Sequence, residues 1–134
     1  MNRIIKFRLV FDKKIVGYMQ YMNQGEKANL NWMYSEDQKT WDFQPKYAYV
    51  EVNQFTGLTD KNGKEIYEGD IFNCIYDFDG CKKHKQAVVY VEVSARFITK
   101  DYGECHQPNV MQNMSDMIRM EVIGNIYENP ELLI

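Results

Sequence analysis

The segment from Gln54 to Phe72 constrains this 134-residue chain most, because glycine turn signals interrupt short apolar runs there at close spacing. Residues 60–63 (Asp-Lys-Asn-Gly) place an acceptor carboxylate at the first turn position. A glycine stands at the last position, where a left-handed backbone causes no Cβ clash. This pattern predicts a hairpin turn with a bulge. Gly57 and Gly69 predict two more points where the chain reverses or another backbone comes close.

The acidic residues of the same segment are Glu65, Glu68 and Asp70. We interpret them as turn and solvent-facing residues. A paired-carboxylate catalytic site needs a cleft, an apolar neighbour that raises one pKa and a partner base. The sequence does not locate any of these.

Composition favours one folded domain. Apolar residues make up 45% of the chain and aromatic residues 14%, which is typical of a globular protein. A chain of this length buries roughly two thirds of its unfolded surface. We therefore expect a single domain over residues 1–134, with an N-terminal β region over 1–53 and a barrel-like region over 54–134.

The net charge of −3 is unevenly spread, with +2 on residues 1–53 and −5 on residues 54–134. An acidic second half argues against a broad phosphate-binding face there. The charged N-terminus contains no signal-peptide core, and no apolar run reaches membrane-spanning length. Three cysteines, Cys74, Cys81 and Cys105, are an odd number and suggest reduced thiols in a cytoplasmic protein.

Period-two alternation predicts strands in the first half of the chain. Ile5, Phe7, Leu9 and Phe11 alternate with Lys6, Arg8 and Val10, which predicts a strand with one buried face. A turn at 12–14 follows, and Trp41 with Phe43 are expected to anchor the connector before Pro45. The expected strands cover residues 5–11, 15–22, 28–34 and 47–52.

In the second half, residues 71–93 predict one long hairpin and residues 95–99 a further strand. Residues 109–119 have a helical period, with an apolar stripe formed by Val110, Met114, Met117 and Ile118. Residues 120–126 return to strand, and Pro130 ends it. The chain is thus expected to be mainly β with one short helix, arranged as a small barrel or sheet pack.

Two blocks and a short N-terminal match resemble a known family. They are residues 54–72, residues 122–133 (Val-Ile-Gly-Asn-Ile-Tyr-Glu-Asn-Pro-Glu-Leu-Leu) and the Ile-Lys-Phe-Arg start at 5–8. Together they resemble the YopX-like family, small proteins carried by bacteriophages and prophages that have no established biochemical activity. The resemblance implies a phage or prophage origin. It also implies a small SH3-like barrel in the C-terminal half, packed with an N-terminal β-hairpin region.

Metal binding and catalysis are both weakly indicated. Cys81 with His84, and Cys105 with His106, could supply thiolate and imidazole ligands for zinc, with Cys74 as a further ligand. Adjacent residues on a strand point in opposite directions, so ordinary loop residues are the favoured interpretation and no cofactor is expected. Only two histidines exist, and no nucleophile elbow or phosphate loop accompanies them. We do not expect an enzyme.

Two surfaces offer binding hypotheses. Lys82, Lys83 and Lys85 form the basic run, which is either a solvated loop tip or a contact for nucleic acid. Ten tyrosines and eight methionines are typical of protein–protein interfaces, although strand tyrosines can simply be half-buried. Tyr18, Tyr47 and Tyr49 are the candidate contacts.

The favoured function is a non-enzymatic module that acts by protein–protein interaction, as a homo-oligomer or with a host or phage partner, in the cytoplasm of the bacterial host. The alternative is a small β-barrel protein that binds nucleic acid through the Lys82–Lys85 loop.

Overall fold

The chain is mainly β. The computed structural model describes residues 4–23, 30–46, 48–49, 51–73, 85–101, 111–113 and 121–133. Within these ranges, ten strands form two antiparallel five-stranded sheets. The chain divides into two compact units, an N-terminal unit over Met1–Gly57 and a C-terminal unit over Leu58–Ile134. The division falls after residue 57 rather than after residue 53.

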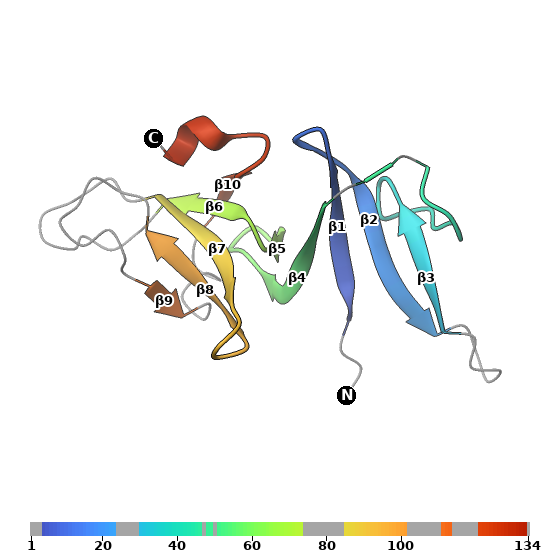
Figure 1. Cartoon of the computed structure of the whole chain (residues 1–134), viewed down its shortest axis with the longest axis horizontal. Coiled ribbons are helices and arrows are strands. Elements are labelled where there is room, and N and C mark those ends of the chain that lie inside the picture. The colour runs from blue at the N-terminus through green and yellow to red at the C-terminus, as the bar shows by residue number, and fades with distance from the viewer. Residues whose placement is uncertain are drawn as a thin grey trace, which may run out of the picture. The chain divides into compact units, whose positions relative to one another are not determined.

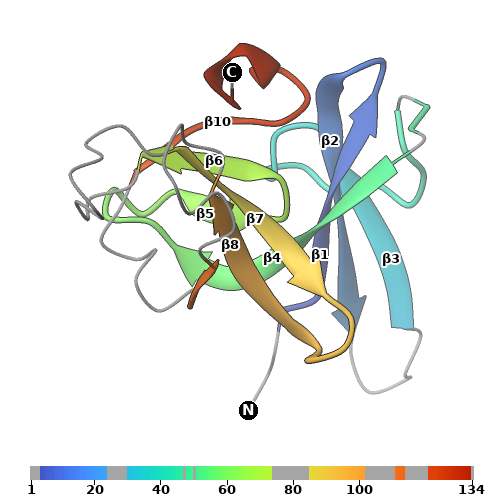
Figure 2. The same cartoon turned by 60° about the vertical axis from the view of Figure 1, so that its left-hand side comes forward.

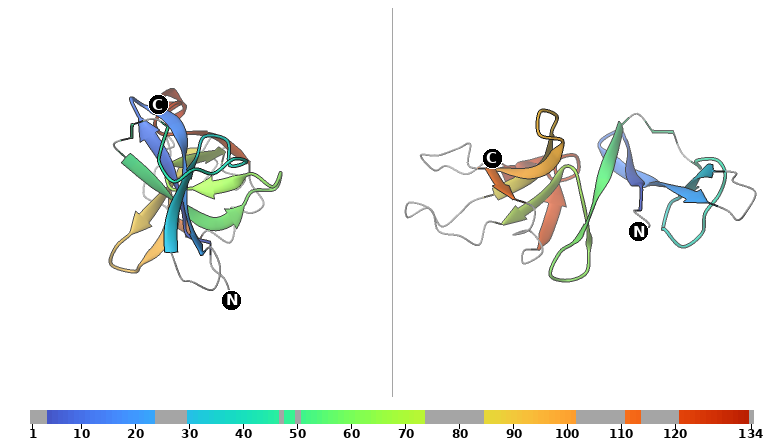
Figure 3. Two further views of the ribbon diagram at one scale, coloured as in Figure 1. Left: turned by 90° about the vertical axis from the view of Figure 1, so that its right-hand side faces the viewer. Right: turned by 90° about the horizontal axis from the view of Figure 1, so that it is seen from below.

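The first sheet has the strand order β3-β2-β1-β4-β5. Figures 1 and 2 both place β1 between β2 and β4, and the further views in Figure 3 show how strongly these strands twist. The five strands are β1 (Lys6–Phe11), β2 (Lys14–Asn23), β3 (Leu30–Ser35), β4 (Glu51–Thr59) and β5 (Glu65–Tyr67).

Strand β1 does not have the one exposed, charged face that its alternation predicts. Lys6 and Arg8 are each only 6% exposed, whereas Phe11 is exposed. The Lys6 Nζ donates to Gln38 Oε1 at 2.8 Å and lies 4.8 Å from the centre of the Phe55 ring. The Arg8 Nε donates to Asn53 Oδ1 at 3.2 Å. The charged side chains are buried because residues distant in sequence supply their partners.

The turn expected at residues 12–14 connects β1 and β2 as a hairpin. Asp12 and Lys13 both have positive φ, 50° and 61°, as a two-residue turn between twisted strands requires. The strand expected at 47–52 begins only at Glu51 and continues to Thr59. Antiparallel pairing with β1, from Val10 opposite Glu51 to Phe7 opposite Gln54, places it there.

The second sheet has the strand order β10-β6-β7-β8-β9. Its core contains Ile66, Phe72, Val88 and Val122. The antiparallel β6–β7 pair confirms the hairpin expected over residues 71–93. In Figure 2, β10 lies beside β6 and leads into a short 3-10 helix, Pro130–Leu133. The strands are β6 (Asp70–Asn73), β7 (Lys85–Val91), β8 (Arg96–Asp101), β9 (Met111–Asn113) and β10 (Val122–Asn125).

The helix expected over residues 109–119 is wrong where the structure describes it. Residues 111–113 form β9, which pairs with β8 from Ile98 opposite Asn113 to Lys100 opposite Met111. Pairing with a neighbouring strand overrides the local helical period. The four residues of the apolar stripe lie outside the described part of the chain. The described strands of the C-terminal unit form an open order and do not close a barrel.

Within the described ranges, no helix has the length and apolar character needed to cross a membrane.

Candidate functional site

Asp60, in the most constrained segment of the sequence, joins two distant parts of the C-terminal unit. Its Oδ1 accepts backbone N–H groups from Asn62 at 2.8 Å and Lys64 at 2.9 Å. Its Oδ2 accepts the N–H of Val122, at the start of β10, at 3.0 Å. Burial raises the pKa of Asp60, but these three N–H groups and the Lys64 charge lower it more, so the pKa lies below its ordinary value. The carboxylate is a structural cross-link.

The glycines of this segment adopt the backbone that the sequence predicts. Gly63 has φ +81° and donates to the Asp60 carbonyl at 3.0 Å, which confirms the turn. Gly69 has φ +89° and is the point of close backbone approach. Its N–H donates to Val88 O and its carbonyl accepts the N–H of Ile126, both at 2.9 Å.

The remaining acidic residues of the segment also act locally. Asp70 is buried and its Oδ2 accepts the N–H of Tyr67 at 2.8 Å. The Tyr67 hydroxyl donates to Glu65 Oε1 at 3.1 Å. Glu68 lies in the turn before Gly69. Glu68 therefore fits its interpretation as a turn residue, whereas Asp70 is buried at the start of β6, so its interpretation as a solvent-facing residue is wrong.

In the C-terminal block, residues 122–133, side-chain oxygens likewise accept backbone N–H groups. Asn125 Oδ1 accepts the N–H groups of Tyr127 at 3.0 Å and Glu128 at 2.9 Å. Asn129 Oδ1 in turn accepts the N–H of Asn125 at 3.2 Å. The side chains that most characterise this sequence are therefore engaged with the backbone, and the surface available for binding must be sought elsewhere.

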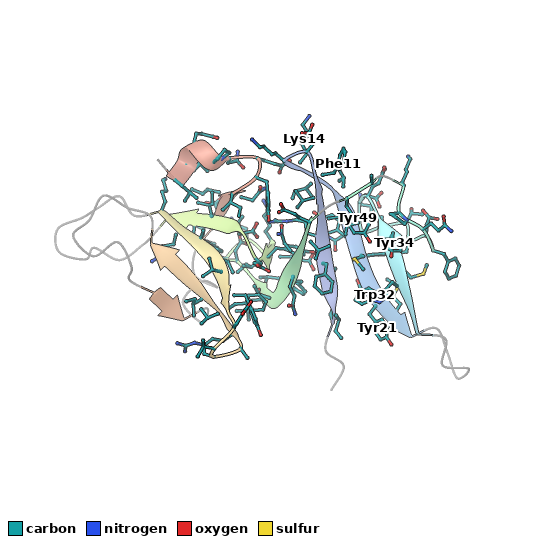
Figure 4. All side chains as sticks on the ribbon, viewed as in Figure 1. Phe11, Lys14, Tyr21, Trp32, Tyr34 and Tyr49 are labelled. Atoms are coloured by element: carbon teal, nitrogen blue, oxygen red, sulfur yellow. The ribbon has the colours of Figure 1, made fainter. Side chains whose placement is uncertain are left out.

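Such a surface exists on the N-terminal unit, where half-exposed rings gather on one side of β1, β2 and β3 (Figure 4). The ring of Trp32 lies 5.8 Å from that of Phe7 and 5.2 Å from that of Tyr21. The rings of Tyr34 and Tyr49 lie 6.5 Å apart. We call these five residues, Phe7, Tyr21, Trp32, Tyr34 and Tyr49, the aromatic face.

Strand register explains why these rings share one side. Tyr21 lies opposite Trp32, and Met19 lies opposite Tyr34. Directly opposite residues of an antiparallel pair point to the same face, and every second residue repeats it. Large rings with little charge among them are typical of the centre of an interface.

A pocket of 270 Å³ lies beside the aromatic face. Leu9, Val16 and Tyr34 supply its apolar wall, and the loop over residues 35–46 supplies polar groups. Burial raises the pKa of the Tyr34 hydroxyl above its usual 10.0, and a hydrogen bond to Tyr49 raises it further. At neutral pH Tyr34 therefore stays protonated and can serve as a hydrogen-bonding group.

Two acidic groups of the pocket, Asp37 and Glu36, are engaged as well. Asp37 Oδ1 accepts the N–H groups of Lys39 at 2.8 Å and Thr40 at 3.1 Å, and these bonds lower its pKa. Glu36 lies 3.6 Å from the Lys46 ammonium. A general acid or base works best with a pKa near the operating pH. The pKa shifts of Asp37 and Tyr34 lead away from neutrality, so neither of these two groups has a pKa suited to proton transfer at neutral pH.

The predicted interface residues are only partly brought together. Tyr49 joins the aromatic face. Tyr18 lies opposite Ser35 and Arg8, on the other side of the sheet from Tyr21 and Trp32. Tyr47 lies outside the described residues. Sequence reasoning missed Tyr21, Trp32 and Tyr34. Their alternation along two expected strands was visible, but only the register shows that the rings meet.

Other candidates have different outcomes. Lys85 begins β7 and is half-buried, while Lys82 and Lys83 lie outside the described residues. Cys74, Cys81, His84, Cys105 and His106 lie outside them too. Elsewhere in the described chain, no three metal-binding side chains gather at one point. Phe43 was expected to be an anchor, but this is wrong because it is 65% exposed.

Two antiparallel sheets, turns held by carboxylates and amides, and an aromatic face define a small mainly β protein. The family model described as YopX protein matches residues 6–134, so the chain belongs to the YopX family. The crystal structure of protein EF1440 from Enterococcus faecalis is similar, with 26% sequence identity and a TM-score of 0.48. That match covers 97% of this chain and 98% of the other. No curated protein matches the chain.

Proposed function

We propose that this protein is a non-enzymatic, phage- or prophage-derived module that assembles with itself through the aromatic face, in the cytoplasm of its bacterial host. The observation that carries the proposal is the set of half-exposed rings around Trp32, in contact at 5.2 Å and 5.8 Å. Rings exposed in a group are an unfavourable surface for a monomer and a favourable one for an interface.

The electrostatics of the pocket support a binding role. Two of its carboxylates are engaged, since Asp37 accepts backbone N–H groups and Glu36 pairs with Lys46. The family resemblance supports the phage origin. It also implies an SH3-like barrel, but the described strands of the C-terminal unit form an open order, so the barrel is not part of the proposal.

Light scattering coupled to size exclusion tests the assembly. At tens of micromolar we expect a mass at least twice the 16.0 kDa of one chain. Tyr21→Ala should shift the mass toward the monomer, because it removes a ring from the aromatic face. The matched control is Tyr90→Ala, which removes an exposed ring of the C-terminal unit that contacts Phe97 at 5.2 Å. A wild-type mass of one chain would contradict the proposal.

A further inference from the structure

The outer edge of β3 is unusual among the strand edges of this protein. On its inner side, β3 pairs with β2 along its whole length, from Tyr18 opposite Ser35 to Asn23 opposite Leu30. On its outer side, the described residues provide one partner, Asp42, which forms an isolated bridge to Tyr34. The Tyr34 N–H donates to Asp42 O at 2.7 Å, and the Asp42 N–H donates back at 2.8 Å.

This bridge fixes the direction of the neighbouring backbone groups. In an antiparallel ladder, residues alternate between those that bond to one neighbour and those that bond to the other. Because Tyr34 directs its N–H and C=O outward to Asp42, Trp32, two residues earlier, directs its own outward as well. Met33 directs its groups inward to β2. No described residue pairs with the outward groups of Trp32.

The edge also lacks the features that normally prevent strand pairing. Proteins usually protect an edge with charged residues, proline or a bulge. The sequence of β3, Leu-Asn-Trp-Met-Tyr-Ser, contains no charge and no proline, and its pairing with β2 is regular. Next to the Asp42 bridge stands Phe43, with 65% of its surface exposed. Backbone groups without a partner among the described residues and apolar side chains therefore occur together at this edge.

A second copy of the chain is the partner that fits best. Two identical neutral strands can pair antiparallel about a twofold axis without bringing like charges together. This arrangement covers two edges with one closed interface.

The size of the surface argues that both the strand edge and the rings take part. The exposed portions of Tyr21, Trp32, Tyr34 and Phe43 offer on the order of 300 Å², given the area that such rings bury when covered. A stable dimer needs about 800 Å² per partner. The rings alone fall short, so contacts along the strand must supply the remainder.

We propose that the outer edge of β3 is the dimer seam, at which Trp32 of each copy bonds through its backbone to β3 of the other copy. This inference rests on the proposed self-assembly and specifies the surface that performs it. The seam extends the five-stranded sheet of each copy into one continuous sheet.

Residue-resolved hydrogen exchange of the wild-type chain tests the seam. The exchange is measured at two protein concentrations, one on each side of the dissociation midpoint found by light scattering. The Trp32 amide should exchange at least ten times more slowly in the dimer. The amides of Met33 and Tyr34 are the internal controls, because they are bonded within one chain and should exchange equally at both concentrations.

A variant pair tests the same point if the dimer does not dissociate on dilution. Trp32→Ala removes the ring but keeps the outward N–H, whereas Trp32→Pro removes both. Fluorescence of Trp41 reports whether each variant is folded. We expect Trp32→Pro to weaken dimerisation at least tenfold more than Trp32→Ala.

The outcomes separate the two proposals. A doubled mass with unchanged Trp32 exchange, or with equal effects of the two folded variants, overturns the seam and leaves self-assembly in place. A single-chain mass at every concentration overturns both proposals.

Discussion

The two units of this protein use their polar and aromatic residues in opposite ways. In the C-terminal unit, Asp60, Asp70 and Asn125 are buried and bonded to backbone N–H groups. In the N-terminal unit, the rings of Tyr21, Trp32 and Tyr34 stay half-exposed. The most recognisable residues of the sequence thus maintain the fold, while the residues available for binding lie in a less recognisable region.

Two carboxylates make the contrast specific. Asp60 and Asp37 each accept two backbone N–H groups through Oδ1 within a local turn. Only Asp60 uses its second oxygen to reach a strand 62 positions away, at Val122. Both carboxylates therefore hold a local turn, but only Asp60 also connects that turn to a distant strand.

The largest effect should come from Asp60→Ala, with a loss of about 3 kcal/mol in the free energy of unfolding. The substitution leaves a buried N–H without its acceptor and removes three hydrogen bonds to a charged group. Asp37→Ala is the matched variant in the N-terminal unit and should lose clearly less, since Asp37 acts as an exposed turn cap. Chemical denaturation followed by circular dichroism measures both. Equal losses would remove the distinction between the two carboxylates.

Gly17→Ala tests how tightly the N-terminal unit is built. A Cβ on Gly17 would lie 2.8 Å from the backbone carbonyl oxygen of Ser35, and backbone cannot move aside easily. We expect a loss of about 2 kcal/mol from overpacking. Both tryptophans, Trp32 and Trp41, lie in the N-terminal unit, so fluorescence-detected unfolding reports this change directly. An unaffected midpoint would show that β2 and β3 can separate at this point.

Gly63→Val tests the hairpin turn of the C-terminal unit. Gly63 has φ +81° and open space around its Cβ position, so the expected loss of about 1–2 kcal/mol comes from backbone strain alone. Gly63→Asn is the control, because asparagine tolerates this conformation better. Thermal unfolding followed by circular dichroism compares them. Similar melting temperatures for valine and glycine would mean that the turn rearranges freely.

The smallest effect should appear on acidification. The pKa of Asp60 in the folded state lies below its ordinary 3.8, so the unfolded chain binds the proton first. Its stabilisation is fully present above the unfolded pKa, near pH 4, and is lost as the pH falls through the folded pKa. Urea unfolding between pH 5 and pH 2 should show this decline, with a shallower slope in Asp60→Ala. Parallel pH profiles would assign the acid sensitivity to other carboxylates.

Local turn chemistry was the part of the structure that the sequence predicted well. The turn at Asp60–Gly63 and the close approach at Gly69 follow from short-range sterics and hydrogen bonding, which neighbouring residues settle among themselves. The helix expected at 109–119 failed at residues 111–113, where pairing with β8 outweighed the local period. Tyr49 was identified as a candidate contact, whereas Tyr21, Trp32 and Tyr34 were not.

Alternation and glycine placement act over a few residues, so the strand-rich class, the turns and the family follow from the sequence. The burial of Lys6 and Arg8 follows from tertiary contacts instead, since Gln38 and Asn53 reach them from 32 and 45 positions away. Tertiary pairing also places Trp32 beside Phe7 and Tyr21, and it directs the Trp32 backbone groups to an edge at which no described residue pairs with them. Register and strand order set these features. Both depend on which segments pair, and segments far apart in the chain contain no local sequence signal that identifies their partner.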